Sequence, residues 1–281
     1  MYDKITYDMG SVIQTEKHYP GNYGAPGMER LPKKKRTPED IARQNERNRV
    51  KKVQRLIIMN FREGDWHLTL TYKKSGRPAT LREAKRCVSK FLSRMRKAYK
   101  RAGYPFKYIC VTERGKKGAC HHHLIIEDIA APALNTKELV MEHWTHGTRN
   151  FSPLYEDGEF EDLAEYLVKK EPKEEGAGCS YTHSRNLAMP VPKRERIHRK
   201  TWRKDPRPKK GFYIVKSSVV NGINPVTGYP YQHYTMRRIH DAAGTRRETE
   251  GRIQLREPRR MGSAGPPDHI RRDGEAGGTY L

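Results

Sequence analysis

Residues 107–127 contain two strand-like segments separated by a short basic loop, and this pair restricts the possible folds more than any other feature. The loop, Lys116-Lys117-Gly118, has the length of a three-residue hairpin loop in which Gly118 takes a positive φ. The residues that flank such a loop pair with each other, and counting back from them sets Glu113 opposite His121. The sequence therefore predicts an antiparallel hairpin whose register is fixed by its loop.

Three side chains with metal-binding atoms fall on one face of this hairpin. Successive strand residues point to opposite faces, so His121 and His123 leave the same face about 7 Å apart, beside Glu113, while Leu124 faces the other way. Two imidazoles and a carboxylate suit Mg²⁺, Mn²⁺ or another divalent transition ion, whereas structural zinc sites usually fill four positions with thiolates. The alternatives are an exposed polar strand, or His122 as a core histidine.

The charge of the chain points to a polyanionic partner. With 57 Lys and Arg against 33 Asp and Glu, the formal net charge is +24, which favours nucleic acid. The four cysteines have no metal-site or disulfide-framework spacing, which is typical of a reducing compartment. Without a signal peptide or an apolar run of about 18 residues, we expect a soluble intracellular protein with no membrane partner.

The composition divides the chain into five segments. We expect one core domain with appendages, because both ends of the chain are polar and show no hydrophobic period. The predicted segments are a flexible basic arm (1–36), a basic helix that Thr37 caps (37–60), a core domain (61–189), a basic linker or DNA-tracking arm with an accessory hairpin of residues 212–220 and 231–238 (190–240), and a disordered tail (241–281).

Hydrophobic periodicity predicts the elements of the core domain. Residues 66–72 alternate as a half-buried strand, with threonines on the polar face. Residues 81–101 form an amphipathic helix with a strongly basic outer face. After the hairpin, a short helix (136–144), a strand (148–155) and a second helix (159–170) follow.

The helix at 159–170 carries a candidate nucleophile. Lys169 and Lys170 lie three and four residues after Tyr166, which places two ammonium groups beside one phenol on a helical face. Phenol has an ordinary pKa of about 10, so a nucleophilic tyrosine needs nearby positive charge or a metal. The alternative is structural, since Leu163, Tyr166 and Leu167 also form an apolar stripe.

These features occur in a characteristic order along residues 66–187. A Leu-Thr-Leu-Thr strand, a basic helix, a Glu-hairpin-His-x-His pair and a Tyr-x-x-Lys helix resemble the HUH endonuclease family of rolling-circle replication initiators. In particular, the chain resembles the replication-associated proteins of the filamentous-phage gene II type, which also have a segment like residues 180–187. The resemblance implies an α+β fold, with an antiparallel sheet of about five strands flanked by helices in a ferredoxin-like arrangement.

The resemblance also implies site roles. Glu113, His121 and His123 would hold Mg²⁺ or Mn²⁺, Tyr166 would be the nucleophile, and Lys169 would assist it. His122 replaces a residue that is usually bulky and hydrophobic in the family, which leaves the choice of ligating pair open. No second tyrosine lies one turn from Tyr166, which implies a single-tyrosine enzyme.

The activity implied is nicking and rejoining of single-stranded DNA at a replication origin through a 5′-phosphotyrosine and a free 3′-hydroxyl. The chain contains no GxxxxGK[ST] motif, so we expect a host helicase and a host polymerase as partners. A protein encoded by a phage, plasmid or other mobile element would work in the cytoplasm of a bacterial host. Two alternatives stay open, a non-catalytic single-stranded nucleic-acid-binding protein and an HUH transposase or relaxase.

Overall fold

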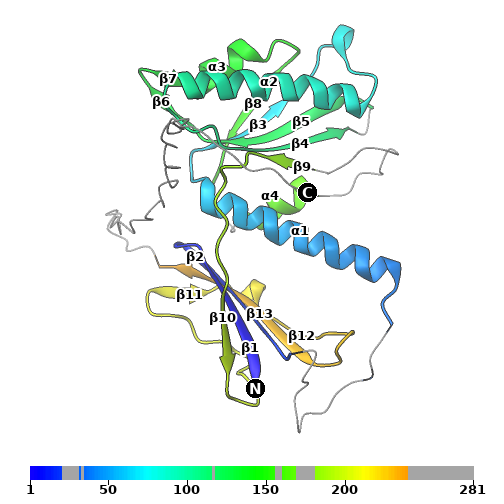
Figure 1. Cartoon of the computed structure of the whole chain (residues 1–281), viewed down its shortest axis with the longest axis vertical. Helices are drawn as coiled ribbons and strands as arrows, with labels where there is room; N and C mark the ends of the chain where they lie inside the picture. The colour runs from blue at the N-terminus through cyan, green and yellow to red at the C-terminus, as the bar shows by residue number, and fades with distance from the viewer. Residues whose placement is uncertain (21–31, 33–34, 116–117, 156–159, 169–180, 240–281) are drawn as a thin grey trace, which may run out of the picture. The chain divides into compact units, whose positions relative to one another are not determined.

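The described residues form two large antiparallel sheets, of five and six strands, with one long helix between them (Figure 1). A third, two-stranded sheet consists of β6 (Ala130–Ala131) and β7 (Leu134–Asn135). The computed structural model describes residues 1–20, 32, 35–115, 118–155, 160–168 and 181–239. Within these ranges no helix has the length and apolar character that crossing a membrane requires. The predicted disordered tail at 241–281 falls outside the described residues.

The first sheet contains the predicted hairpin at its centre. Its strands lie in the order β8-β3-β5-β4-β9, and each is antiparallel to its neighbours. The strands are β3 (Trp66–Leu70), β4 (Tyr108–Arg114), β5 (Cys120–Ile126), β8 (Arg149–Pro153) and β9 (Tyr181–His183). The predicted α+β class with a five-stranded antiparallel sheet is therefore confirmed.

Helices cover both faces of this sheet, and strand alternation decides which residues each face receives. One face packs against α2 (Leu81–Arg101) and α3 (Thr136–His143), in a core that includes Leu68, Cys110 and Leu124. The other face packs against α1 (Pro38–Asn60) and α4 (Glu161–Val168), in a core that includes Val111 and Ile125. The period of two along each strand thus separates two cores, and the candidate ligands lie on the face of α1 and α4.

Helix α1 begins where the sequence predicts. Thr37 accepts a hydrogen bond from the Asp40 backbone N–H at 3.2 Å, and Asp40 accepts one from the Thr37 backbone N–H at 3.3 Å. This reciprocal pair satisfies two backbone donors that a helix start leaves free, and Pro38 fits the first turn because it has no N–H. The predicted basic helix at 37–60 is present as α1.

The second sheet corrects the prediction of a flexible arm at residues 1–36. Its strands lie in the order β10-β1-β2-β13-β11, with β12 also paired to β13. Its strands are β1 (Tyr2–Asp8), β2 (Val12–His18), β10 (Lys193–Ile197), β11 (Phe212–Ile214), β12 (Val220–Ile223) and β13 (Pro230–Arg238). Residues 1–20 therefore contain ordered strands, and β1 and β2 lie inside the sheet rather than at its edge.

The arm prediction was wrong because β2 does not alternate. Four consecutive residues of β2 are buried, namely Val12, Ile13, Gln14 and Thr15. Each face of the strand therefore carries buried residues, polar as well as apolar, and the sequence shows no alternation with a period of two. The partner strand β10 is also nearly 200 residues from β1 in the sequence, with Tyr2 opposite Ile197.

The linker prediction for residues 190–210 is also corrected, because residues 193–197 form the edge strand β10. The accessory hairpin is present in modified form. Both β11 and β12 pair with β13, and a short 3-10 turn, η2 (Lys216–Ser218), interrupts them.

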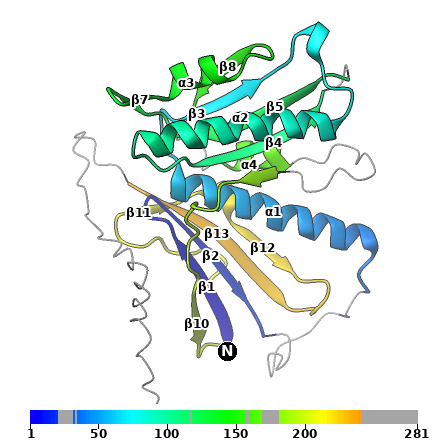
Figure 2. The ribbon, with the colours of Figure 1, turned by 45° about the horizontal axis from the view of Figure 1, so that its top comes forward.

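Helix α1 lies between the two sheets (Figure 2). Its side chains differ in character toward each sheet. Toward the first sheet it buries Val53, Leu56 and Ile57. Toward the second sheet it presents Arg55, which is 8% exposed and donates hydrogen bonds to Gln14 at 2.8 Å and to Glu16 at 3.1 Å. The buried cation is thus paired and hydrogen-bonded, as a charge removed from water must be.

Candidate active site

The hairpin β4–β5 brings Glu113, His121 and His123 together on one face, as its loop predicts. Glu113 lies opposite His121, and Val111 lies opposite His123. Gly118 has a φ of +78°, and the backbone N–H of Gly115 donates to the Ala119 carbonyl at 2.8 Å. The predicted register and the predicted left-handed glycine are both confirmed.

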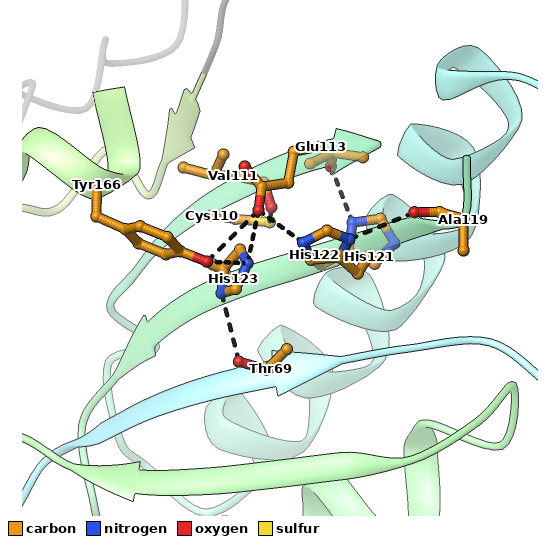
Figure 3. Close-up of polar contacts among 10 residues, drawn as sticks. Thr69, Cys110, Val111, Glu113, Ala119, His121, His122, His123 and Tyr166 are labelled. Carbon is orange, nitrogen blue, oxygen red and sulfur yellow. Dashed lines mark hydrogen bonds and ion pairs between the residues drawn. The ribbon is translucent and has the colours of Figure 1, made fainter. Parts of the chain in front are cut away.

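The three side chains converge on one point (Figure 3). Glu113 Oε1 lies 2.6 Å from His121 Nε2 and 2.9 Å from His123 Nε2, and the three ligand atoms all lie within 4.8 Å of one another. The imidazole N–H groups hydrogen-bond to the carboxylate of Glu113 and lower its pKa to about 2. Glu113 is therefore ionised at neutral pH, as a carboxylate ligand has to be.

The donor set fits a divalent metal ion. Two imidazole nitrogens and one carboxylate oxygen are ligands that first-row divalent ions accept, and three protein ligands leave coordination positions for water and substrate. The side chain of His123 is 6% exposed, and those of Glu113 and His121 are 18% and 21% exposed. The cluster is therefore held by the protein and also reachable from solvent.

Thr69 orients His123 from the neighbouring strand. Its hydroxyl lies 3.3 Å from His123 Nδ1, and β3 pairs with β5 so that these two residues are directly opposite. Hydrogen bonding of the second ring nitrogen fixes the ring so that Nε2 points at Glu113. The sequence indicates that Thr69 faces the polar side of its strand, but not that it reaches His123.

His67 is a second residue that the sequence did not assign to the site. It lies on the same face of β3 as Thr69, and its ring centroid is 5.4 Å from that of His123 and 6.3 Å from that of Tyr166. Burial lowers the pKa of His67 to about 4, so the ring is neutral at neutral pH. It places an uncharged imidazole ring beside the cluster.

His122 lies on the opposite face and belongs to the core. It is fully buried, and its Nε2 and Nδ1 lie 2.7 Å from the Tyr72 hydroxyl and 2.9 Å from the Thr112 hydroxyl. Its ring also packs edge-on against Trp144, with centroids 5.5 Å apart. Burial lowers its pKa to about 3, so it is a neutral core histidine. Of the adjacent histidines, His121 and His123 are thus the pair that can share one ion.

We expect His122→Ala to lower the free energy of unfolding by about 3 kcal/mol, because it leaves a cavity and removes the hydrogen bonds that the ring makes with the buried Tyr72 hydroxyl and the half-buried Thr112 hydroxyl. His121→Ala, at a partly exposed position on the other face, should cost less than about 1 kcal/mol. Urea denaturation of both variants tests this difference. Equal losses of stability would contradict the assignment of His122 to the core.

Tyr166 points from α4 toward the cluster rather than into the core. Leu167 and Val168 anchor the helix on the sheet, whereas Tyr166 is 43% exposed. Its Oη lies 2.9 Å from His123 Nε2 and 3.5 Å from Glu113 Oε1 (Figure 3). The phenol oxygen is therefore at hydrogen-bonding distance from candidate ligand atoms. Lys169 and Lys170, the other predicted catalytic residues, fall outside the described residues.

A groove of about 500 Å³ adjoins Tyr166 between α1 and α4. Arg43 and Arg47 line it from α1, and Asp162 and Glu165 line it from α4. Glu46 of α1 lines it too, so the charge of the groove is mixed. Guanidinium groups are the side chains best suited to bind phosphate in two places at once.

Comparison with known proteins agrees with the predicted resemblance. Residues 65–174 match the family model of the replication-associated protein of the ORF2 and gene II protein type, a segment that includes Glu113, His121, His123 and Tyr166. Neither the curated proteins nor the solved structures gave a match to the chain. The family match supports a rolling-circle replication initiator of the gene II type, which confirms the resemblance predicted from the sequence.

Proposed function

Because residues 65–174 match a family of replication-associated proteins, we propose that the protein starts rolling-circle replication by nicking and rejoining single-stranded DNA. One observation carries the proposal: the phenol oxygen of Tyr166 lies within 3.5 Å of both Glu113 Oε1 and His123 Nε2. A nucleophile and a set of metal ligands therefore share one point, which is the arrangement that phosphoryl transfer to a tyrosine needs.

Glu113, His121 and His123 would hold Mg²⁺ or Mn²⁺, which when bound acts as a Lewis acid toward a phosphate oxygen. Thr69 keeps His123 in the rotamer that aims Nε2 at the shared point. Glu113 stays ionised and balances part of the positive charge gathered there. The rigid hairpin register fixes these groups before substrate arrives, so little reorganisation accompanies the reaction.

In the proposed step, Tyr166 Oη attacks the phosphorus of the scissile phosphodiester. A bond from Oη to phosphorus forms, the bond from phosphorus to the 3′ oxygen breaks, and the phenol proton ends on that 3′ oxygen. The products are a 5′-phosphotyrosine and a free 3′-hydroxyl. Since one phosphate ester replaces another, the reverse reaction rejoins the strand in the same site.

The phenol has to lose its proton although its ordinary pKa is about 10. Lys169 and Lys170 follow Tyr166 by three and four residues, and we propose that their ammonium groups stabilise the developing phenolate. Arg43 and Arg47 line the groove beside Tyr166 and would hold phosphates of the incoming strand. Unwinding and extension would then depend on a helicase and a polymerase of the host, in the cytoplasm of the host cell.

Two other functions use parts of the same site. A transposase or a relaxase of the HUH type would share the chemistry, but the family match favours replication. A non-catalytic single-strand binder has no use for a phenol within 3.5 Å of a Glu-His-His cluster. We therefore place replication initiation first.

The polarity of the products tests the proposed function. With Mg²⁺ or Mn²⁺ and a pool of single-stranded oligonucleotides that have a randomised core, we expect a protein–DNA adduct that survives SDS. A label at the 3′ end should stay with the protein, and a label at the 5′ end should appear on a shorter strand that a polymerase can extend. A 3′-phosphate terminus, or a 5′ label retained on the protein, would contradict the mechanism.

A further inference from the structure

Residues 198–210 contain neither helix nor strand, yet their backbone is fastened to the second sheet. Tyr19 donates from its hydroxyl to the Lys200 carbonyl at 2.5 Å. The Gln232 amide donates to the carbonyls of Arg203 and Lys204, at 2.9 Å each, and Asn221 donates to Lys204 at 3.2 Å. All these contacts use backbone oxygens, so the side chains of the segment are left outside the contacts.

An aromatic ring anchors the same segment. Trp202 stacks on Tyr19 with centroids 5.0 Å apart and an interplanar angle of 29°, and it packs edge-on against Tyr2 at 5.0 Å. Tyr229 closes this cluster. The segment is therefore held at its centre as well as through its carbonyls.

Six of the cations in this segment have no acidic partner among the described residues. Asp205 is the one acid between residues 198 and 210. The array consists of the exposed residues Arg199, Lys200, Arg203, Lys204, Arg207 and Lys210. None of these six forms an ion pair within the part of the chain that the structure describes, whereas Lys193, Arg196 and Lys209 do. A polyanion would supply the counter-charge that the array lacks.

The chemistry of the array suits the phosphates of a duplex better than a single strand. Single-strand binders combine cations with exposed aromatic rings on which bases stack. Here the one Trp, Tyr or Phe ring of the segment belongs to Trp202, and it is already packed against Tyr19 and Tyr2. Duplex DNA hides its bases and presents about one charge per 1.7 Å of axis, so fixed cations can bind it without stacking.

We propose that the cation array of residues 199–210 binds the phosphate backbone of duplex DNA, and so holds the duplex that flanks the nicked strand. The array lies outside the family match at 65–174 and belongs to the sheet made by both ends of the described chain. The inference rests on the proposed function for its choice of DNA as the polyanion. Because the backbone is already fixed, binding orders only side chains and loses less entropy than a free tether would.

A matched pair of charge variants tests the array in the full-length protein. The array variant changes Arg199, Arg203, Lys204 and Arg207 to Gln, and the control changes Arg82, Arg86, Lys90 and Arg94 on the exposed face of α2 to Gln. Each removes three Arg and one Lys charge, so both variants have the same net charge. The array segment is held to the sheet through its backbone oxygens, so thermal unfolding should match the parent.

Binding is measured against a random-sequence duplex of about 30 base pairs and against oligo(dT) at several salt concentrations. For the duplex, we expect the log–log salt slope of the array variant to fall by about 0.9 for each phosphate that the protein no longer neutralises, and its affinity near 0.1 M salt to fall by roughly tenfold or more. The control variant should have the same salt slope for duplex binding as the parent. The affinity of the array variant for oligo(dT) should change little.

Two results would contradict the proposal that the array binds duplex DNA. Equal losses of duplex affinity in the array variant and the control variant would mean that only net charge matters. If the array variant lost as much affinity for oligo(dT) as for duplex, or more, the segment would bind single-stranded DNA instead. Adduct formation on single-stranded DNA is followed in the same samples. A parent that binds duplex through the array but forms no adduct would refute the proposed function and leave the array standing.

Discussion

Tyr166→Phe is expected to abolish formation of the covalent protein–DNA adduct and to lower the rate of single-strand cleavage by at least about 10⁴-fold. The change removes only the oxygen that lies 2.9 Å from His123 Nε2, and it leaves the ring edge-on to His123 with centroids 5.0 Å apart. Tyr166 is 43% exposed, so the free energy of unfolding should change by less than about 0.5 kcal/mol. Cleavage of end-labelled single strands and urea denaturation measure the two effects.

Two tyrosines near Tyr166 in the sequence serve as controls. Tyr155 is 63% exposed, and Tyr181 lies in β9 opposite Val111. Both Tyr155→Phe and Tyr181→Phe should cleave at a rate close to that of the parent. Cleavage by Tyr166→Phe together with loss of cleavage in either control would move the nucleophile to that residue.

Removal of the metal ion, or of either histidine ligand, has the second largest expected effect. We expect EDTA, His121→Ala and His123→Ala each to lower the rate of single-strand cleavage by roughly 10³-fold, because each removes charge stabilisation at the scissile phosphate. Added Mn²⁺ should restore the EDTA-treated parent but neither variant. Isothermal titration with Mn²⁺ should show weaker binding by the same two variants.

His198→Ala is a matched control, because this exposed histidine lies outside the cluster. It should cleave DNA and bind Mn²⁺ as the parent does. Undiminished cleavage in EDTA would contradict a metal-assisted reaction, and cleavage by His121→Ala at the parent rate would remove that residue from the ligand set.

The local parts of the site could be predicted from the sequence because short-range geometry determines them. The three-residue loop sets the register of β4 and β5, and this register alone brings Glu113 to His121. The faces of His121, His122 and His123 follow from a period of two. The sequence left the ligating pair open, and the partners of His122 in the core now favour the outer two.

The parts that depend on distant pairing could not be predicted. Thr69 meets His123 because β3 pairs with β5, across 54 residues, and no local pattern determines that register. In the sequence, Tyr166 belongs to the same apolar helical stripe as Leu167, so it could equally be a core residue. Only the packing of α4 on the sheet directs its hydroxyl to the cluster.

The second sheet shows the same limit on a larger scale. Its strand β2 buries Gln14 and Thr15 beside Val12 and Ile13, so its sequence lacks the alternation that identifies a strand. Gln14 can be buried there because Arg55 of α1 donates a hydrogen bond to it and Gln14 in turn donates one to Gln54 of α1. Such compensation between segments far apart in the chain becomes visible only when both are in place.

The proposed mechanism depends most on the identity of the residue that becomes linked to DNA. Mass spectrometry of the adduct formed by the unmodified protein, after nuclease and protease digestion, measures it directly. We predict a single modified peptide that carries a nucleotide 5′-phosphate on Tyr166, formed with Mg²⁺ or Mn²⁺ and absent in EDTA. A nucleotide on Tyr155, Tyr181 or any other residue, or cleavage without a covalent adduct, would contradict this mechanism.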